Sequence, residues 1–410
     1  MLCGFVSMAQ RVENWSGELN AGIQKLPITL KLQIGKDTVA ELGSPSQTKT
    51  LFKAERIVLR NDSMMLSVKL GLSKVVFKGR YLAEDSVCGV FKQNGAKLDL
   101  CLKRGESAVM VNRPQTPKDI DYVCEEVSFR VKDVDYEFKG TLTYPKRKKY
   151  LPAVILVSGS GLQDRNEELF QHKPFEVIAD YLTRNGIAVL RYDDRGWGTQ
   201  DMKLLNGTTL DFALDAEAAF EFLKSHKRID PKRIGFAGHS EGGVIAPIVA
   251  SRNKDVAFVI MLAGTGVDGE SVLIEQNREI LGKMGASQED IEAQINSLKD
   301  RDNNPALQVP WFKCFFDLDP SVYLSKLTMP VLALNGDKDV QVIASQNLPA
   351  IAAALEKAGN KHYKTMLLPN LNHLFQECET GLPDEYYNIE ETISPKVLEI
   401  MRDFIKEYAR

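Results

Sequence analysis

The residues best suited to chemistry form the segment Gly238-His-Ser-Glu-Gly242. It follows an apolar run, Arg233–Ala237, that is typical of a buried strand, and it precedes a helical pattern over Gly243–Ser251. A serine between a strand and a helix, with glycine two positions away on each side, sits on a sharp turn that exposes its hydroxyl for nucleophilic attack. The alternative is a glycine-rich helix start in which Ser240 is only a cap. The strand and helix context favours the nucleophile.

A serine hydroxyl needs a general base to attack a carbonyl carbon, and the base needs an orienting carboxylate. On such a turn the carboxylate and then the histidine follow the serine in the chain. Among the five histidines, His373 lies in a loop after the apolar run Thr365–Leu368, whereas His362 precedes that run. We therefore expect His373 to be the base. His239 is interpreted as a packed residue of the turn, and His172 as a helix-start residue.

The orienting acid is expected just after the apolar run Val331–Leu334, where a strand would end. The segment Gly336-Asp-Lys-Asp339 offers two carboxylates there. Asp337 is nearer the turn and better placed to cap it. We therefore favour Asp339 as the acid.

The oxyanion of an acyl-transfer intermediate needs two backbone N–H donors. One is expected at Glu241, directly after the serine. The other is expected at Ser160 or Gly161, in the loop Ser158-Gly-Ser-Gly-Leu162 that follows the apolar run Ala153–Val157. The same loop is also compatible with a simple tight turn. A phosphate-binding loop is disfavoured, because no Gly-Lys-Ser/Thr follows.

Short apolar runs alternate with helical stretches through the second part of the chain, which predicts a doubly wound α/β domain with a mostly parallel sheet. A helical insert is expected at about residues 267–328, over the carboxyl ends of the strands, where ligands of open α/β sheets bind. Its aromatic cluster supplies the candidate substrate-binding residues Trp311, Phe312 and Phe315. Such clusters are also common in cores, so this assignment stays an expectation.

The first part of the chain alternates apolar and polar residues with a period of two, which predicts an antiparallel β domain over residues 10–112. A linker at 113–120 then leads to the α/β domain at 121–410. Asn94-Gly95 is a typical two-residue hairpin turn, and it would place Cys88 opposite Cys101. Whether these cysteines form a disulfide or stay as thiols is left open. Residues 1–9 are interpreted as the remnant of a signal peptide, because Ser7-Met8-Ala9 has the small–x–small form of a cleavage site.

These motifs together resemble the α/β-hydrolase superfamily, in its esterase and dienelactone-hydrolase-like group with an added N-terminal β domain. The segments that carry the resemblance run in order through the whole second domain: Gly159-Ser-Gly-Leu-Gln-Asp-Arg165, His172-Lys-Pro-Phe175, Tyr192-Asp-Asp-Arg-Gly-Trp-Gly198, Gly238-His-Ser-Glu-Gly-Gly243, Asn335-Gly-Asp-Lys-Asp-Val-Gln341 and Leu371-Asn-His373. The resemblance implies a carboxylesterase for short-chain acyl or small aromatic esters, with Ser240, Asp339 and His373 as the triad. It also implies that Asp164, Arg165, Asp194 and Arg195 order the loops around the site.

Composition and charge exclude several other classes. A formal net charge of −3 over 410 residues argues against a nucleic-acid binder, and no apolar run is long enough to span a bilayer. The cysteines form no CxxC pair, so a zinc site is not expected. Acyl transfer by the expected triad needs no metal or organic cofactor. The expected partner is a small-molecule ester, in an exported protein (periplasmic or secreted) or otherwise a cytoplasmic one. The alternatives are a serine peptidase or amidase with the same triad, and a non-catalytic binding protein led by the β domain.

Overall fold

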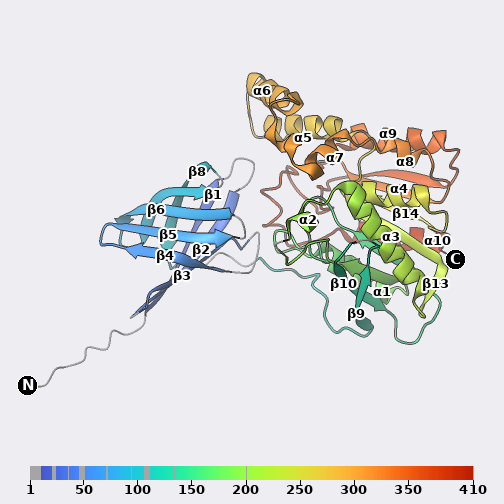
Figure 1. Ribbon diagram of the computed structural model, residues 1–410, viewed down its shortest axis with the longest axis horizontal. Helices are drawn as coiled ribbons and strands as arrows, with labels where there is room; N and C mark the ends of the chain where they lie inside the picture. The colour runs from blue at the N-terminus through green and yellow to red at the C-terminus, as the bar shows by residue number, and fades with distance from the viewer. Residues whose placement is uncertain are drawn as a thin grey trace, which may run out of the picture. The chain divides into compact units, whose positions relative to one another are not determined.

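A computed structural model describes residues 11–409, apart from 21–24, 36, 46–50, 71–72, 94, 106–110, 133 and 200. The chain divides into two compact units (Figure 1). The first contains the residues up to Asn112 together with Leu169–Gln171, and the second contains Arg113–Glu168 and His172–Arg410. The expected signal-peptide remnant lies outside the described residues. No helix in the described part of the chain is both long and apolar enough to cross a membrane.

The first unit is a closed antiparallel barrel in which each strand pairs with the next and β1 pairs with β8. This confirms the antiparallel β domain and specifies it as a barrel. Alternate residues point inward, so Trp15, Leu30 and Phe77 are fully buried in its core. Closure leaves no unpaired strand edge. The strands are β1 Arg11–Asn20, β2 Lys25–Ile34, β3 Val39–Gly43, β4 Phe52–Leu59, β5 Ser63–Leu70, β6 Ser73–Ala83, β7 Ser86–Gln93 and β8 Ala96–Arg104.

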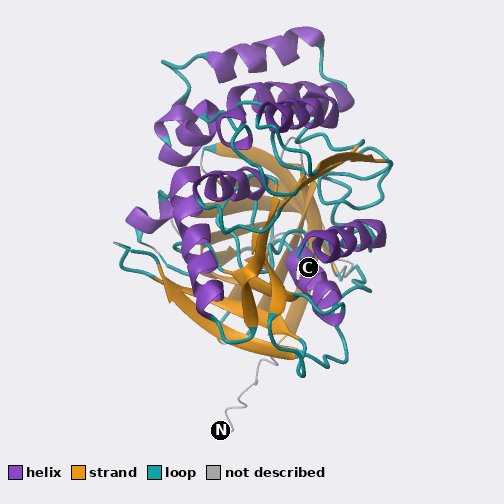
Figure 2. Cartoon of the chain, turned by 90° about the vertical axis from the view of Figure 1, so that its right-hand side faces the viewer, coloured by secondary structure: helices purple, strands orange, loops and turns teal. Residues whose placement is uncertain are grey.

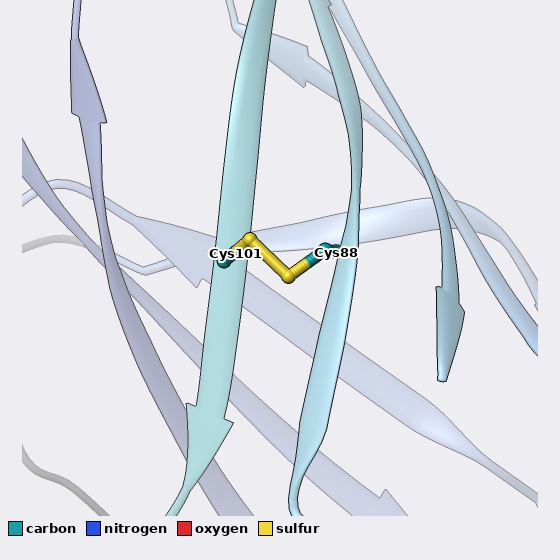
Figure 3. Close-up of a disulfide and its surroundings, with 2 residues drawn as sticks. All are labelled: Cys88 and Cys101. Carbon is teal, nitrogen blue, oxygen red and sulfur yellow. A yellow bond between two sulfur atoms is a disulfide. The ribbon is translucent and has the colours of Figure 1, made fainter. Parts of the chain in front are cut away.

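The hairpin of β7 and β8 has the register that the sequence predicts. Gln93 pairs with Ala96 around a two-residue turn, and Cys88 pairs with Cys101. Asn94 lies outside the described residues, but Gly95 adopts φ 86°, a left-handed backbone conformation that favours glycine. The two cysteines, with Cα atoms 4.0 Å apart, are joined in a disulfide (Figure 3).

The second unit is built on an eight-stranded sheet in the order β16-β15-β14-β13-β11-β12-β10-β9. The strands from β16 to β12 run parallel, and β10 and β9 add an antiparallel edge. The apolar runs of the sequence become strands that are buried on both faces, as expected for a parallel sheet. The strands are β9 Val123–Arg130, β10 Glu137–Tyr144, β11 Leu151–Val157, β12 Ala188–Tyr192, β13 Ile229–His239, β14 Val259–Leu262, β15 Val331–Gly336 and β16 Tyr363–Leu368.

Helices cover both faces of this sheet (Figure 2). One face packs against α3 Thr209–Ser225, α4 Gly242–Arg252, α8 Ser321–Leu324 and α9 Ala344–Lys357. The other packs against α1 Pro174–Arg184 and α10 Pro395–Tyr408. A short helix, α2 Met202–Leu205, precedes α3. The predicted α/β architecture is therefore confirmed.

A helical insert leaves the sheet after β14 and returns at β15. It contains α5 Gly269–Lys283, α6 Gln288–Lys299, the 3₁₀ helix η1 Pro305–Gln308, α7 Pro310–Asp317 and α8. Side chains cap several of these helices: Asp268 accepts the amide N–H of Ser271, and Ser287 accepts that of Asp290. In Figure 1, α5, α6 and α7 lie together, with α6 farthest from the sheet.

Candidate active site

Ser240 occupies the turn between β13 and α4, at the centre of the sheet. Its φ of 53° is left-handed, a strained conformation for a residue with a side chain. The turn is held because the Ser240 amide donates to the Leu262 carbonyl of the neighbouring strand at 2.8 Å, and Gly243 donates to the Ser240 carbonyl at 2.9 Å. Ser240 is partly exposed, although both its chain neighbours are buried. The turn thus leaves Ser240 partly exposed between two buried residues.

The glycines on each side of Ser240 are required by close backbone contacts. A Cβ on Gly238 would lie 1.9 Å from the Gly242 carbonyl oxygen, and one on Gly242 would lie 2.1 Å from the Val157 carbonyl oxygen. Neither neighbour is a flexible side chain that could move away. The Gly-x-Ser-x-Gly spacing therefore has a steric reason in this chain: the turn folds onto itself and onto the end of β11.

His373 and Asp339 form a buried hydrogen-bonded pair, with Nδ1 of His373 2.8 Å from Oδ2 of Asp339. Each side chain follows the end of a neighbouring parallel strand, β16 and β15. The Asp339 carboxylate also accepts the backbone N–H groups of Gln341 and Val342 and the side-chain amide of Asn335. This arrangement fixes both the carboxylate and the tautomer of the histidine, in which Nδ1 carries the proton.

Asp337, the other candidate acid, does not face His373. Its carboxylate accepts the backbone N–H of Asn370 at 2.6 Å and joins the two loops that follow β15 and β16. His362 is exposed and precedes β16, at the opposite end of that strand from His373.

The loop after β11 lies directly against Ser240. A Cβ on Gly159 would be 3.2 Å from Cβ of Ser240. The Gly159 amide is already used, because it donates to Oε1 of Glu167 at 2.6 Å, and the Gln163 amide donates to Asp194. Ser160 and Gly161, which lie between them, are exposed. The two positions predicted for an oxyanion donor therefore lie in the exposed part of this loop.

Glu241 has a buried carboxylate that connects four segments around the turn. It accepts hydrogen bonds from Thr209 Oγ1 at 2.6 Å and from the indole of Trp311 at 3.0 Å, and from the Ser160 side chain as well. Burial raises the pKa of Glu241, and these hydrogen bonds oppose the rise. The turn, α3, the loop after β11 and α7 of the insert are thus tied to one side chain.

The aromatic residues predicted to bind substrate have different surroundings. Trp311 reaches the turn through Glu241. Phe315 is buried and stacks on Trp311 with ring centroids 5.9 Å apart. Phe312 is partly buried between Trp311 and Phe316. The structure therefore brings Trp311 to the site and places the other two behind it, within the insert.

Two buried residues that sequence reasoning did not assign to the site also lie there. His239 places Nδ1 2.9 Å from Oε1 of Glu167 and Nε2 3.0 Å from the carbonyl oxygen of His373. Its ring lies 4.8 Å from the ring of His373, centroid to centroid. Adjacent glutamates such as Glu167 and Glu168 are ordinarily solvated, so nothing in the sequence indicates that Glu167 is only 1% exposed.

The remaining charged residues of the shared motifs order the loops. Arg165 makes a bidentate ion pair with Asp193, and Arg195 is paired with Asp215. Asp194 accepts from Ser158 Oγ and the Gln163 amide, and burial raises its pKa well above the usual value. Asp164 accepts the amides of Asn166 and Glu168. His172 is fully buried, and its ring contacts the Tyr386 carbonyl, Thr392 Oγ1 and the Gln376 amide. No group of three or more His, Cys, Asp or Glu side chains that could hold a metal ion occurs in the described ranges.

Comparison with known proteins adds sequence relationships to this geometry. The family described as the C-terminal domain of BAAT and acyl-CoA thioester hydrolases matches residues 216–377, a range that includes Ser240, Asp339 and His373. The esterase EstD of Thermotoga maritima is 33% identical over 281 residues, covering 65% of this chain and 65% of the esterase. The polyketide transferase ATR5 of Stachybotrys chlorohalonatus is 31% identical over 140 residues, or 34% of this chain and 44% of the transferase. The chain thus spans less than two thirds of either relative.

A dienelactone hydrolase from Anabaena variabilis is among the similar solved structures, with 18% identity and a TM-score of 0.45, covering 71% of this chain and 100% of that one. The strand order, the serine turn between β13 and α4, and the acid and histidine that follow β15 and β16 are the arrangement expected of an α/β-hydrolase fold. The chain therefore has an α/β-hydrolase fold with an additional N-terminal β-barrel, and its sequence is similar to an esterase and to the acyl-CoA thioester hydrolase family.

Proposed function

We propose that this protein is a serine carboxylesterase that hydrolyses short-chain acyl or small aromatic esters through an acyl-enzyme intermediate. Two observations support the proposal: Ser240 lies on a strained turn that backbone hydrogen bonds hold, and Asp339 and His373 form a hydrogen-bonded pair after β15 and β16. His239, the chain neighbour of Ser240, donates to the backbone of His373, which brings the loop of the base to the turn. The similarity to an esterase points in the same direction.

The proposed reaction has two steps. His373 takes the Ser240 proton through Nε2 while Oγ attacks the ester carbonyl, and Asp339 stabilises the imidazolium that forms. The backbone N–H groups of Glu241 and of Ser160 or Gly161 stabilise the tetrahedral oxyanion. His373 then protonates the leaving alcohol, and a water molecule activated by the same histidine releases the acid. No cofactor enters this scheme.

Substrate selection is assigned to the insert in this proposal. Trp311 is the aromatic side chain that reaches the turn, since its indole N–H donates to Glu241. Phe315 stacks on the other side of the Trp311 ring and limits its movement. A rigid aromatic wall beside the nucleophile favours small acyl groups over long chains.

The test is a panel of aryl esters of increasing acyl length, assayed on the full chain and on Ser240→Ala. We expect hydrolysis of the short esters and a loss of about 10⁶-fold in kcat for the variant. Aminoacyl amides and acyl thioesters form two further arms of the panel. Faster turnover of an amide would replace the esterase proposal by a peptidase or amidase, and unchanged ester hydrolysis by Ser240→Ala would overturn both.

A further inference from the structure

The protonation of His239 is constrained by the two groups that its ring contacts. Nε2 lies 3.0 Å from the carbonyl oxygen of His373. A carbonyl oxygen has no hydrogen to give, so this contact is a hydrogen bond only if Nε2 carries a proton. Nδ1 lies 2.9 Å from Oε1 of Glu167. The open question is whether the proton between Nδ1 and Oε1 belongs to the histidine or to the glutamate.

The surroundings of Glu167 favour the histidine as the owner of that proton. Oε1 of Glu167 already accepts the Gly159 amide at 2.6 Å, and an ionised carboxylate is the stronger acceptor for two N–H groups. Oε2 of Glu167 is buried, and no hydrogen bond to it is found among the described residues. A carboxylate that is only half solvated by hydrogen bonds needs a positive charge beside it.

We infer that His239 is a buried imidazolium paired with the Glu167 carboxylate, and that this pair is a positioning device that holds the oxyanion loop and the base loop in register around Ser240. The connections form one continuous chain: the Gly159 amide donates to Glu167, His239 donates to Glu167 from Nδ1, and His239 donates to the His373 carbonyl from Nε2. The inference rests on the proposed function, because it assigns a role in that catalytic site.

This chain crosses three segments that are far apart in the sequence. Gly159 and Glu167 belong to the loop after β11, His239 to the end of β13, and His373 to the loop after β16. Beside an ionised Glu167, which has no proton to donate, a histidine with one donor and one acceptor nitrogen could join only two of them. With two donating nitrogens, the ring at the end of β13 can bind both the loop after β11 and the loop after β16.

The other charged groups around the ring are consistent with a cation there. Burial acts to lower the pKa of His239, but the charge of Glu167, the hydrogen bonds from the ring and the charge of Asp339 outweigh burial and raise it. His373 is the other titratable ring against His239, with centroids 4.8 Å apart. Asp194, after β12, interacts with Glu167, but burial raises the pKa of Asp194 well above its usual value, so it is not one of these charges.

The first test is NMR of the full chain labelled with ¹⁵N only at histidine. The five histidines give few signals, and His239→Gln identifies the pair that belongs to His239. We expect both ring nitrogens of His239 to carry protons at neutral and mildly alkaline pH. A spectrum with one protonated and one unprotonated nitrogen at neutral pH would overturn the inference.

The second test separates the charge from the hydrogen bonds. Glu167→Gln removes the negative charge but keeps an amide oxygen that can accept the Gly159 N–H, so we expect the imidazolium signature to disappear while the fold persists. Glu167→Ala removes the connection entirely and is expected to lower kcat about 100-fold with little change in KM, since misplaced catalytic groups slow the chemical step. His362→Gln is the matched control, because His362 is exposed.

The two arms distinguish this inference from the proposed function. The NMR measurement needs no substrate. If His239 is an imidazolium but the protein hydrolyses no ester, the ion pair is supported and the esterase proposal is wrong. Conversely, if a Glu167→Ala variant folds, as judged by circular dichroism, and retains the parent kcat, only the inferred positioning role of the pair is wrong. Glu167→Gln provides the folded comparison if the alanine variant does not fold.

Discussion

The indole Nε1 of Trp311 lies 3.0 Å from both carboxylate oxygens of Glu241. One residue belongs to α7 of the insert and the other follows the nucleophile directly. The position of the insert is therefore linked to the geometry of the turn by a part-buried hydrogen-bonded contact.

Trp311→Phe should loosen that link while keeping an aromatic ring. The buried Glu241 carboxylate loses a donor, which costs ~1–3 kcal/mol, so α7 should be held less firmly. We expect KM for the preferred short ester to rise about tenfold and the relative rates on longer acyl chains to increase. The esters of the acyl-length panel provide the measurement. Trp197→Phe is the control, since Trp197 is 42% exposed, and an identical profile for both variants would exclude a role of Trp311 in selection.

The two aspartates after β15 should differ sharply in their effect on catalysis. Asp339→Asn changes the acceptor that fixes the His373 tautomer, and the expected loss of kcat is ~10⁴-fold. Asp337→Asn keeps an acceptor for the Asn370 amide and should have nearly the parent activity. Steady-state kinetics on one short ester measures both. Similar losses in the two variants would mean that the loop, rather than the Asp339–His373 contact, is what matters.

The glycines of the turn should be far less replaceable than a glycine elsewhere in the fold. Gly242→Ala would place a Cβ 2.1 Å from the Val157 carbonyl oxygen, so the turn or β11 must move. We expect a loss of about 3 kcal/mol or more in the free energy of unfolding, together with loss of activity. Gly282→Ala, in α5, meets no atom within 4 Å and should raise stability by about 0.5 kcal/mol. Urea denaturation of the two variants compares them directly.

His172 should make the fold sensitive to mild acid. Burial, with the charge of Arg113, lowers the pKa of His172 from 6.5 to about 4. The unfolded chain therefore binds the proton more readily than the folded one, and stability is lost as pH falls from 6.5 toward 4. The full contribution is about 3 kcal/mol. The measurement is the unfolding free energy against pH for the parent and His172→Gln, where the difference between the two curves should narrow over this range. Parallel curves would contradict the assignment.

Much of the fold can be predicted from local patterns in the sequence. The apolar runs at 153–157 and 331–334 are strands β11 and β15 because continuous apolar residues suit a parallel sheet that is covered on both faces. The hairpin register that pairs Cys88 with Cys101 follows from the turn length alone. These features depend on residues that are close in the chain or on burial, and both can be predicted from residue types.

The connections across the site are less visible. The preference for Asp339 over Asp337 depends on loop geometry, which spacing only suggests. Glu167 and His239 are ordinary polar residues by type, and their roles arise because β11, β13 and β16 bring three distant loops together. The contact of Trp311 with Glu241 and the burial of Phe315 against Trp311 likewise depend on how α7 packs. Such contacts are set by tertiary packing, so no local sequence pattern predicts them.

The insert begins after β14 and ends before β15, and these two strands are hydrogen-bonded neighbours in the sheet. The entropy cost of closing a loop depends only weakly on its length, so a longer or shorter insert between these strands leaves the strand order unchanged. Under the proposed function, changes in this segment would alter substrate selection while Ser240, Asp339 and His373 keep their supporting strands. Selection and catalysis would then be separable within one domain.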